Sequence, residues 1–235
     1  MLKEIDTDIW VAQQPRRYLG LSVGTKMTVI GLPNRELVVI SPIQTRKTLV
    51  NQLGELGVIK HIIAPNLYHY LFAAHFKSLY PQATFWAAPG LTLKKPELPI
   101  DRTIQGDRGE LFPGLEFVFF NGFRVFGLNG VDELNECVFF HSSSRTLILT
   151  DTAFHFDESF PLLTQFAARI IGGYKQLSPS LLERIATKEL EQVRESVKKV
   201  LQWDFERVIV AHGSIVERDG KEKFKEGYEQ FLRWL

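Results

Sequence analysis

The chain contains a single cysteine, Cys137, and carries almost no net charge. One thiol excludes an intrachain disulfide and suits a reducing compartment. The 28 basic and 27 acidic residues give a net charge of +1, a field too weak to favour nucleic acid or an anionic membrane surface. No apolar run approaches the roughly 20 residues that a membrane helix requires. We therefore expect a small-molecule substrate, and neither nucleic acid nor a membrane as a partner.

The first residues also lack the apolar stretch of a signal peptide, because Lys3, Glu4, Asp6 and Asp8 interrupt it. We therefore expect a cytoplasmic protein. Several catalytic motifs are missing: the GxSxG nucleophile elbow, the GxxxxGK[ST] phosphate loop and the GxGxxG dinucleotide turn do not occur. The apolar surroundings expected for Cys137 would raise the pKa of its thiol and leave it inert.

The length of 235 residues and a hydrophobic content of 45% predict one domain over 1–235 with a substantial core. Strand-like and helix-like patterns alternate along the chain and favour mixed sheets covered by helices. The expected strands are 9–12, 27–32, 37–41, 61–64, 83–88, 115–120, 123–128, 137–140, 146–150 and 207–211. The expected helices are 45–56, 67–79, 181–201 and 221–235. The first three strands predict an antiparallel meander, and residues 157–174 indicate a helix, a lid or part of an interface.

Three of the apolar segments lead into polar residues that can bind a ligand. His69 follows the strand at 61–64, Asp151 ends the strand at 146–150, and His212 ends the strand at 207–211. Reactive groups gather at the carboxyl ends of strands in α/β sheets, so we expect these three residues to meet. Two imidazoles and one carboxylate suit a catalytic zinc ion with an open position, or a non-haem Fe(II) facial triad. The alternative is that each has a structural role: His69 as a hydrogen-bonded helix residue, Asp151 as an N-cap or turn residue, and His212 as part of a His-Gly turn.

Other polar residues are weaker candidates. His155 follows Asp151 closely and is a candidate for the same cavity. His141 ends an apolar strand before a serine-rich turn, where a structural role is the simpler interpretation. Asp132 lies in an acidic loop at 131–136, either as a solvated turn residue or as a fourth ligand. The remaining histidines, His61 and His75, are more simply explained as surface or core residues.

These segments resemble the metallo-β-lactamase superfamily from Met27 to His212. That family has a T-H-x-H-x-D-H motif after a strand, a later G-H-T-x-G loop, a strand ending in Gly-Asp and a final histidine. Residues 63–69 align with the first motif and keep only its last histidine, His69. The family's other ligands are replaced at four positions, Ala64, Asn66, Tyr68 and Asp132. Thr150-Asp151 and Ala211-His212-Gly213 match the last two features.

The segments 64–69, 139–141 and 144–151 are similar to an uncharacterised branch of the superfamily, classed as a domain of unknown function. The resemblance implies an α+β fold, the αββα four-layer sandwich of two mixed β-sheets flanked by helices. The resemblance also implies that His69, Asp151 and His212 are ligands of the family's second metal position. The first position has lost both of its N-terminal histidines.

The function implied is that of a mononuclear hydrolase. One divalent transition metal, zinc or iron, would activate water against an ester, thioester, amide or phosphoester. Asp132 or Asn66 would orient that water. The candidate substrate contacts are Tyr68, Tyr70, His155 and His141.

Two other functions stay open. The four replaced ligands favour a non-catalytic binding or scaffold protein without a metal. The two-His-one-carboxylate set also suits an iron-dependent redox enzyme. Residues 157–174 are either a substrate lid or a dimer surface, so a homodimer is compatible with the sequence.

Overall fold

The computed structural model describes residues 1–127 and 130–233. The chain forms two compact units, unit 1 from Met1–Gln14 with Thr25–Gly106 and unit 2 from Pro15–Gly24 with Asp107–Leu235. The expectation of one domain over 1–235 stays a prediction. Among the described residues, no helix is both long and apolar enough to cross a membrane.

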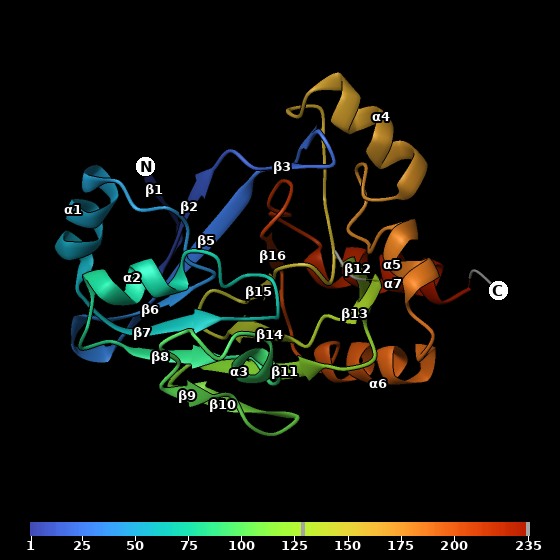
Figure 1. The fold of residues 1–235 in the computed structure, drawn as a ribbon. Coiled ribbons are helices and arrows are strands. Elements are labelled where there is room, and N and C mark those ends of the chain that lie inside the picture. The colour runs from blue at the N-terminus through green and yellow to red at the C-terminus, as the bar shows by residue number, and fades with distance from the viewer. Residues whose placement is uncertain (128–129, 234–235) are drawn as a thin grey trace. The chain divides into compact units, whose positions relative to one another are not determined.

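Unit 1 is built on a seven-stranded mixed sheet with the order β1-β2-β5-β6-β7-β8-β9 (Figure 1). The strands are β1 (Leu2–Asp6), β2 (Ile9–Gln14), β5 (Thr25–Leu32), β6 (Glu36–Ile40), β7 (Val58–Ala64), β8 (Thr84–Ala87) and β9 (Arg102–Thr103). The pairs β2–β5 and β5–β6 are antiparallel, so the predicted meander is confirmed. The strands from β6 to β9 run parallel, as crossover connections require.

The helical segments of unit 1 are η1 (Pro33–Arg35), α1 (Lys47–Leu56), α2 (Ala73–Leu79) and α3 (Leu91–Lys94). Both α1 and α2 contact β7, and they bury Leu53 and Phe76 in one apolar cluster with Ile62 and Phe85 of the sheet. Burying each such side chain contributes on the order of 2–3 kcal/mol to the free energy of folding. This core fixes the end of β7 from which His69 follows.

The helix predicted over 67–79 is too long, because α2 begins only at Ala73. The side-chain oxygen of Asn66 accepts the backbone N–H groups of Tyr68 and His69, each at 2.8 Å. An asparagine that accepts these two N–H groups bonds like a helix N-cap, but residues 67–72 form bends and turns before α2 begins. His69 therefore lies in the loop between β7 and α2.

Unit 2 is built on a five-stranded sheet with the order β10-β11-β14-β15-β16. Its strands are β10 (Arg108–Phe112), β11 (Leu115–Phe120), β14 (Glu136–His141), β15 (Thr146–Leu149) and β16 (Arg207–Val210). Only the pair β15–β16 is parallel, so the carboxyl ends of these two strands lie at the same edge. Two ribbons complete the unit, β3 (Arg17–Tyr18) with β4 (Leu21–Ser22) and β12 (Arg124–Gly127) with β13 (Gly130–Glu133).

The helices of unit 2 are α4 (Leu162–Ile171), α5 (Leu181–Ala186), α6 (Leu190–Val200) and α7 (Gly220–Arg233). The single helix predicted over 181–201 is wrong, because Thr187 is extended and divides it into α5 and α6. The Thr187 hydroxyl accepts the backbone N–H of Arg124, which ties this break to β12. Residue 128 of the predicted strand and residues 234–235 of the closing helix lie outside the described residues.

Candidate metal centre

A buried carboxylate holds the loop that carries Asp151. Glu136, at the start of β14, is fully buried, and its Oε1 accepts the N–H of Thr150 and the hydroxyl of Thr152, both at 2.8 Å. Its Oε2 accepts the N–H of Asp151 at 2.7 Å. Burial raises the pKa of Glu136, and the charge of Asp151 raises it further, against the effect of the donated hydrogen bonds. Three donors on one carboxyl group fix the backbone of Asp151 from the neighbouring strand.

The same loop is held a second time by α7. The hydroxyl of Tyr228 donates a short hydrogen bond to the carbonyl oxygen of Thr152. Tyr228 is fully buried, and burial, with the charge of Glu136, raises the pKa of its hydroxyl well above the usual value. The phenol therefore stays a neutral donor, and the loop is bonded on both sides of Asp151.

His212 follows β16 and turns one ring nitrogen towards a main-chain acceptor. Its Nδ1 lies 2.6 Å from the carbonyl oxygen of Gly24. A carbonyl oxygen only accepts, so Nδ1 carries a proton and Nε2 is the ring nitrogen left to bind a metal. This Nε2 lies 3.4 Å from Oδ1 of Asp151. The imidazole is thus oriented by the bond on its far side.

Gly213 allows the chain to leave the site directly after His212. Its φ is 109°, a left-handed conformation that favours glycine. A Cβ atom at this position would lie 2.1 Å from the carbonyl oxygen of His155. Glycine is therefore required at 213 for two reasons: its backbone conformation, and the close approach of the His155 backbone, which pairs with it in a β-bridge.

A second polar residue orients His69 in unit 1. Nδ1 of His69 lies 2.6 Å from the hydroxyl oxygen of Ser41, the residue after β6. Ser41 is buried, has a φ of 56°, and donates its N–H to the carbonyl oxygen of Ile63 at 3.0 Å. A left-handed serine is uncommon and strained, and such residues gather at functional sites. Ser41 therefore leaves Nε2 of His69 as the ring nitrogen available for a metal.

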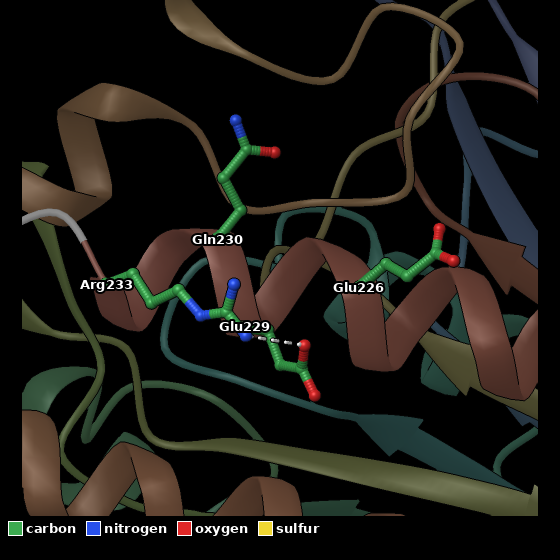
Figure 2. A pocket seen from close by; sticks show the side chains of 4 residues that line it. All are labelled: Glu226, Glu229, Gln230 and Arg233. Carbon is green, nitrogen blue, oxygen red and sulfur yellow. Dashed lines mark hydrogen bonds and ion pairs between the residues drawn. The ribbon is translucent and has the colours of Figure 1, made fainter.

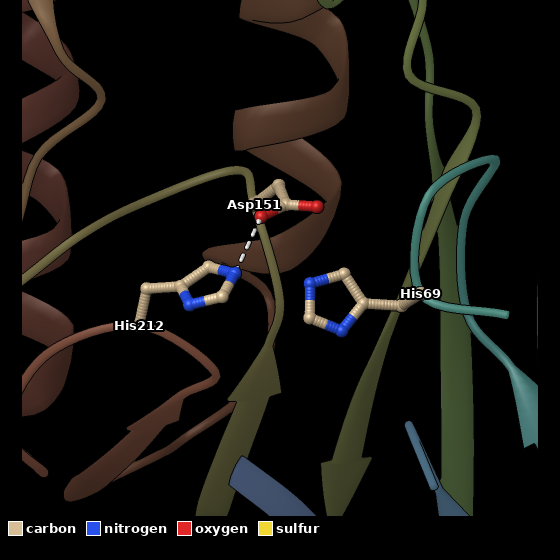
Figure 3. A group of neighbouring side chains, drawn as sticks. All are labelled: His69, Asp151 and His212. Atoms are coloured by element: carbon tan, nitrogen blue, oxygen red, sulfur yellow. Dashed lines mark ion pairs between the residues drawn. The ribbon is translucent and has the colours of Figure 1, made fainter. Parts of the chain in front are cut away.

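One ligand atom from each of His69, Asp151 and His212 lies within 4.8 Å of the others (Figure 3). Two ligands of one tetrahedral zinc ion, at bond lengths of about 2.0–2.2 Å, stand roughly 3.4 Å apart. The Nε2–Oδ1 separation of 3.4 Å between His212 and Asp151 has this value. The donor set therefore fits a divalent metal.

The two predicted water-orienting residues differ in their surroundings. Asn66 is fully buried, and its side-chain oxygen is used to hold the backbone of Tyr68 and His69. Asp132 was expected in a loop, but it lies in β13, opposite Val125 of β12. The two strands pair antiparallel, with Arg124 opposite Glu133 and Gly127 opposite Gly130.

The predicted substrate contacts are placed differently from one another. His155 makes a strand bridge with Gly213, and its Nδ1 lies 3.3 Å from the carbonyl oxygen of Ser214. Tyr68 and Tyr70 pack against the core of unit 1, and the Lys94 ammonium lies 3.8 Å from the centre of the Tyr68 ring.

His141 is not brought to Asp151. It ends β14, at the opposite end of that strand from Glu136. Its two ring nitrogens lie 2.8 Å from the Ser144 hydroxyl and 3.0 Å from the Ser143 hydroxyl. His141 therefore bonds the turn between β14 and β15, and its role as a substrate contact stays a prediction.

An open depression over α7 offers no comparable chemistry. It is lined by four side chains of this one helix, Glu226, Glu229, Gln230 and Arg233 (Figure 2). Arg233 and Glu229 form an ion pair at 3.3 Å, spaced one helical turn apart. This is the pattern of a solvated helix face.

Sequence reasoning missed the residues that orient the ligands, namely Glu136, Ser41 and Gly24. Glu136 ends the predicted acidic loop at 131–136, although a glutamate that begins a fully buried strand is a signal for a buried carboxylate. No local pattern marks Ser41 or Gly24, which lie 28 and 188 residues from the histidines they contact.

The fold is similar to solved structures of metalloproteins over nearly the whole chain. A metallo-beta-lactamase from Pontibacter korlensis is 11% identical, with 99% of each chain covered and a TM-score of 0.67. The metallo-beta-lactamase FIM-1 from Pseudomonas aeruginosa, in its mono-zinc form, is 9% identical, with 99% of this chain and 96% of that chain covered and a TM-score of 0.67. The metal-soaked Flv1 flavodiiron core from Synechocystis sp. PCC6803 is 16% identical, with 99% of this chain and 60% of that chain covered and a TM-score of 0.68. The predicted α+β fold of metallo-β-lactamase type is confirmed.

Comparison with curated proteins gave no match. A family model described as a domain of unknown function (DUF4336) matches residues 6–172. The matched range is more than half of the chain and contains His69 and Asp151. The chain therefore belongs to the DUF4336 family, a domain of unknown function with the metallo-β-lactamase fold.

Proposed function

We propose that the chain is a mononuclear metal-dependent hydrolase whose metal is held by His69, Asp151 and His212. The observation that carries the proposal is the grouping of their ligand atoms within 4.8 Å. The bonds that Ser41 and Gly24 make to Nδ1 of the two histidines support it, because ligating imidazoles usually bond a second group through the other nitrogen.

The residues around the three ligands support one metal rather than two. Ala64 has no ligand atom, and the side-chain oxygen of Asn66 already accepts two backbone N–H groups. Both residues stand where the superfamily places histidines of its first metal position. The mono-zinc form of FIM-1 gives a precedent for one ion on this fold.

Bound here, zinc or iron would polarise a carbonyl or phosphoryl oxygen and lower the pKa of water towards neutrality. The chain's part is positioning: Glu136 and Tyr228 hold the backbone around Asp151, and Ser41 and Gly24 select the ring nitrogens. Asp132 and Asn66 stay our candidates for orienting water.

The substrate class proposed is a small ester, thioester, amide or phosphoester. Tyr68, Tyr70 and His155 stay our candidates for contacting it. A small substrate suits a chain with a net charge of +1, and a cytoplasmic location suits its single buried thiol.

Metal analysis of the full chain, purified without chelators, tests the proposal. We expect about one zinc or iron per chain. Single substitutions His69→Ala, Asp151→Ala and His212→Ala should each remove the metal, whereas His75→Ala, on an exposed position of α2, should keep it. Metal-free wild-type protein that also takes up no added zinc or iron would instead support a scaffold without a metal.

The activity is tested with the metal-loaded protein on chromogenic esters, thioesters, amides and phosphodiesters. We expect hydrolysis of one class that a chelator abolishes and added metal restores. The His75→Ala variant should match the wild type. Stoichiometric metal without hydrolysis of any class, but with oxygen consumption in the iron form, would favour the redox alternative.

A further inference from the structure

Helix α4 exposes its large apolar side chains and buries its polar and small ones. The four large exposed residues, between 61% and 81% accessible, are Leu162, Leu163, Phe166 and Ile170. The buried residues of the helix are Thr164, Gln165 and Ala168. Solvent-facing helices of a monomer show the opposite distribution. The arrangement indicates that something apolar covers α4.

The outward orientation of the apolar side chains is fixed by bonds on the other face of the helix. The Thr164 hydroxyl donates to the carbonyl oxygen of Ser22 at 3.1 Å. The Gln165 side-chain amide donates to the carbonyl oxygens of Phe160, at 2.8 Å, and Glu158, at 3.2 Å. At 100° per residue the four apolar residues share an arc of about 100°. They form one stripe along the helix.

The hairpin of β3 and β4 lies beside α4 on the side of Thr164, through the Thr164–Ser22 bond (Figure 1), and it exposes two further apolar residues. Tyr18 and Leu19 at the hairpin are 50% and 79% exposed. We call the six residues the α4 patch. At on the order of 100 Å² each they expose roughly 600 Å² of apolar surface, at the upper end of the roughly 300–600 Å² of the largest patch on a monomer and about three quarters of the 800 Å² per partner of a standard interface.

We propose that the α4 patch is a homodimer interface in which the α4 helices of two copies pack antiparallel about a twofold axis. A twofold interface places the same patch on both subunits, and a continuous apolar stripe is complementary to itself. The inference does not depend on the proposed function, because all six residues belong to unit 2 and none is a metal ligand.

The charges at the rim of the patch favour the antiparallel order. Glu158 lies just before the helix, and Arg169 lies in its last turn. The Arg169 guanidinium stacks on the Tyr174 ring, 3.6 Å from its centre, and donates to the Gln165 side chain at 3.3 Å. Antiparallel packing brings Arg169 of each copy towards Glu158 of the other and also pairs the helix dipoles favourably. Glu158 and Lys175 form an ion pair at 3.0 Å, so the rim carries both signs. An anionic lipid surface would favour a uniformly basic rim instead.

Light scattering coupled to size-exclusion chromatography, and sedimentation equilibrium, test the proposal on the full chain. We expect a dimer for the wild type at micromolar concentration. The double variant Leu163→Glu with Phe166→Glu should be monomeric with an unchanged circular dichroism spectrum. Leu93→Glu, an exposed leucine on α3, is the matched control and should stay dimeric. A wild-type monomer at high concentration overturns the proposal, and flotation of that monomer with anionic vesicles would assign the patch to a membrane surface.

The antiparallel arrangement of the two α4 helices is tested by charge exchange and by cross-linking. Arg169→Glu should weaken the dimer at least about tenfold, and adding Glu158→Arg should restore it. Phe166 is at the middle of α4, so Phe166→Cys should cross-link to its own counterpart with a short bismaleimide, whereas Leu93→Cys should not. The native Cys137 is buried and does not interfere. Failure of both the restoration and the Phe166→Cys cross-link overturns the antiparallel order.

Discussion

The loops that carry Asp151 and His69 are held in different ways. The Asp151 loop is bonded by residues distant in sequence, Glu136 from β14 and Tyr228 from α7. The His69 loop is bonded mainly by a residue three positions earlier, Asn66, with Ser41 contacting only the imidazole. The first loop therefore depends on the packing of unit 2, and the second largely shapes itself. Substitutions of Glu136, Asn66 and Ser41 should therefore differ in how much they lower the free energy of unfolding and how much they weaken metal binding.

The largest effect is expected for Glu136→Ala. Removing the carboxyl group leaves three buried donors without this acceptor, which costs about 3–5 kcal/mol of unfolding free energy. Glu136→Gln keeps one acceptor oxygen and should cost about half as much. Urea titration followed by circular dichroism measures both.

Metal content of the folded Glu136→Gln variant completes this test. We expect a 10–100-fold weaker metal affinity, because the backbone of Asp151 loses an anchor. Glu133→Ala, an exposed acid on β13, is the control and should change stability by less than about 0.5 kcal/mol. Equal stability of Glu136→Ala and the control would show that the loop does not need the carboxylate.

The next effect is expected for Asn66→Ala, which removes the acceptor for two backbone N–H groups at a fully buried position. We expect a loss of about 1–3 kcal/mol, as for a helix cap or a buried hydrogen bond. Metal affinity should fall with it, because the backbone of His69 is released. Asn66→Asp keeps an oxygen at the same place and should retain more metal than Asn66→Ala. The reverse order would contradict the capping role.

A smaller effect on stability, but a clear one on metal binding, is expected for Ser41→Ala. The hydroxyl orients the imidazole of His69 and does not hold its backbone, so unfolding should change by about 0.5–1.5 kcal/mol. Metal affinity should fall 10–100-fold. Ser41→Gly also lacks the hydroxyl but relieves the φ of 56°, so it should be more stable than Ser41→Ala with the same metal affinity. Unequal metal affinities would assign the effect to the backbone.

The contrast between the loops also explains what could be predicted from the sequence. The strands β7, β15 and β16, and the ligand after each, follow from apolar runs that end on a polar residue. The helix expected from 67 begins only at Ala73, because residues 67–72 form bends and turns, and the helix at 181–201 was wrong because Thr187 is extended and bonds β12. The periodicity of the apolar residues does not record either break.

The orienting residues were beyond prediction for a different reason. Glu136 has a visible but ambiguous signal, since a glutamate next to other acids is usually solvated. The contact of Gly24 with His212 exists only after β16 and residues 15–24 have come together in unit 2. Its carbonyl group is common to every residue, so no side chain identifies it. Long-range main-chain contacts of this kind follow from the fold and not from a motif.

The smallest effect compares Glu136 with the more exposed carboxylate of Asp101 in unit 1. Asp101 accepts hydrogen bonds from the Lys77 ammonium, at 2.8 Å, and from the N–H of Phe85, at 2.7 Å. These bonds, that from Lys77 first, lower the pKa of Asp101, whereas burial raises the pKa of Glu136. A carboxyl group whose pKa is lower in the folded state stabilises above its unfolded pKa of about 3.9, and this contribution is lost as pH falls through the folded pKa. With 43% of the Asp101 side chain exposed, the contribution is small.

Asp101→Asn should therefore lower the thermal midpoint slightly at pH 7 and leave it equal to the wild type near pH 2, as measured by calorimetry. A difference that persists undiminished at low pH would show that Asp101 acts through its shape and not through its charge.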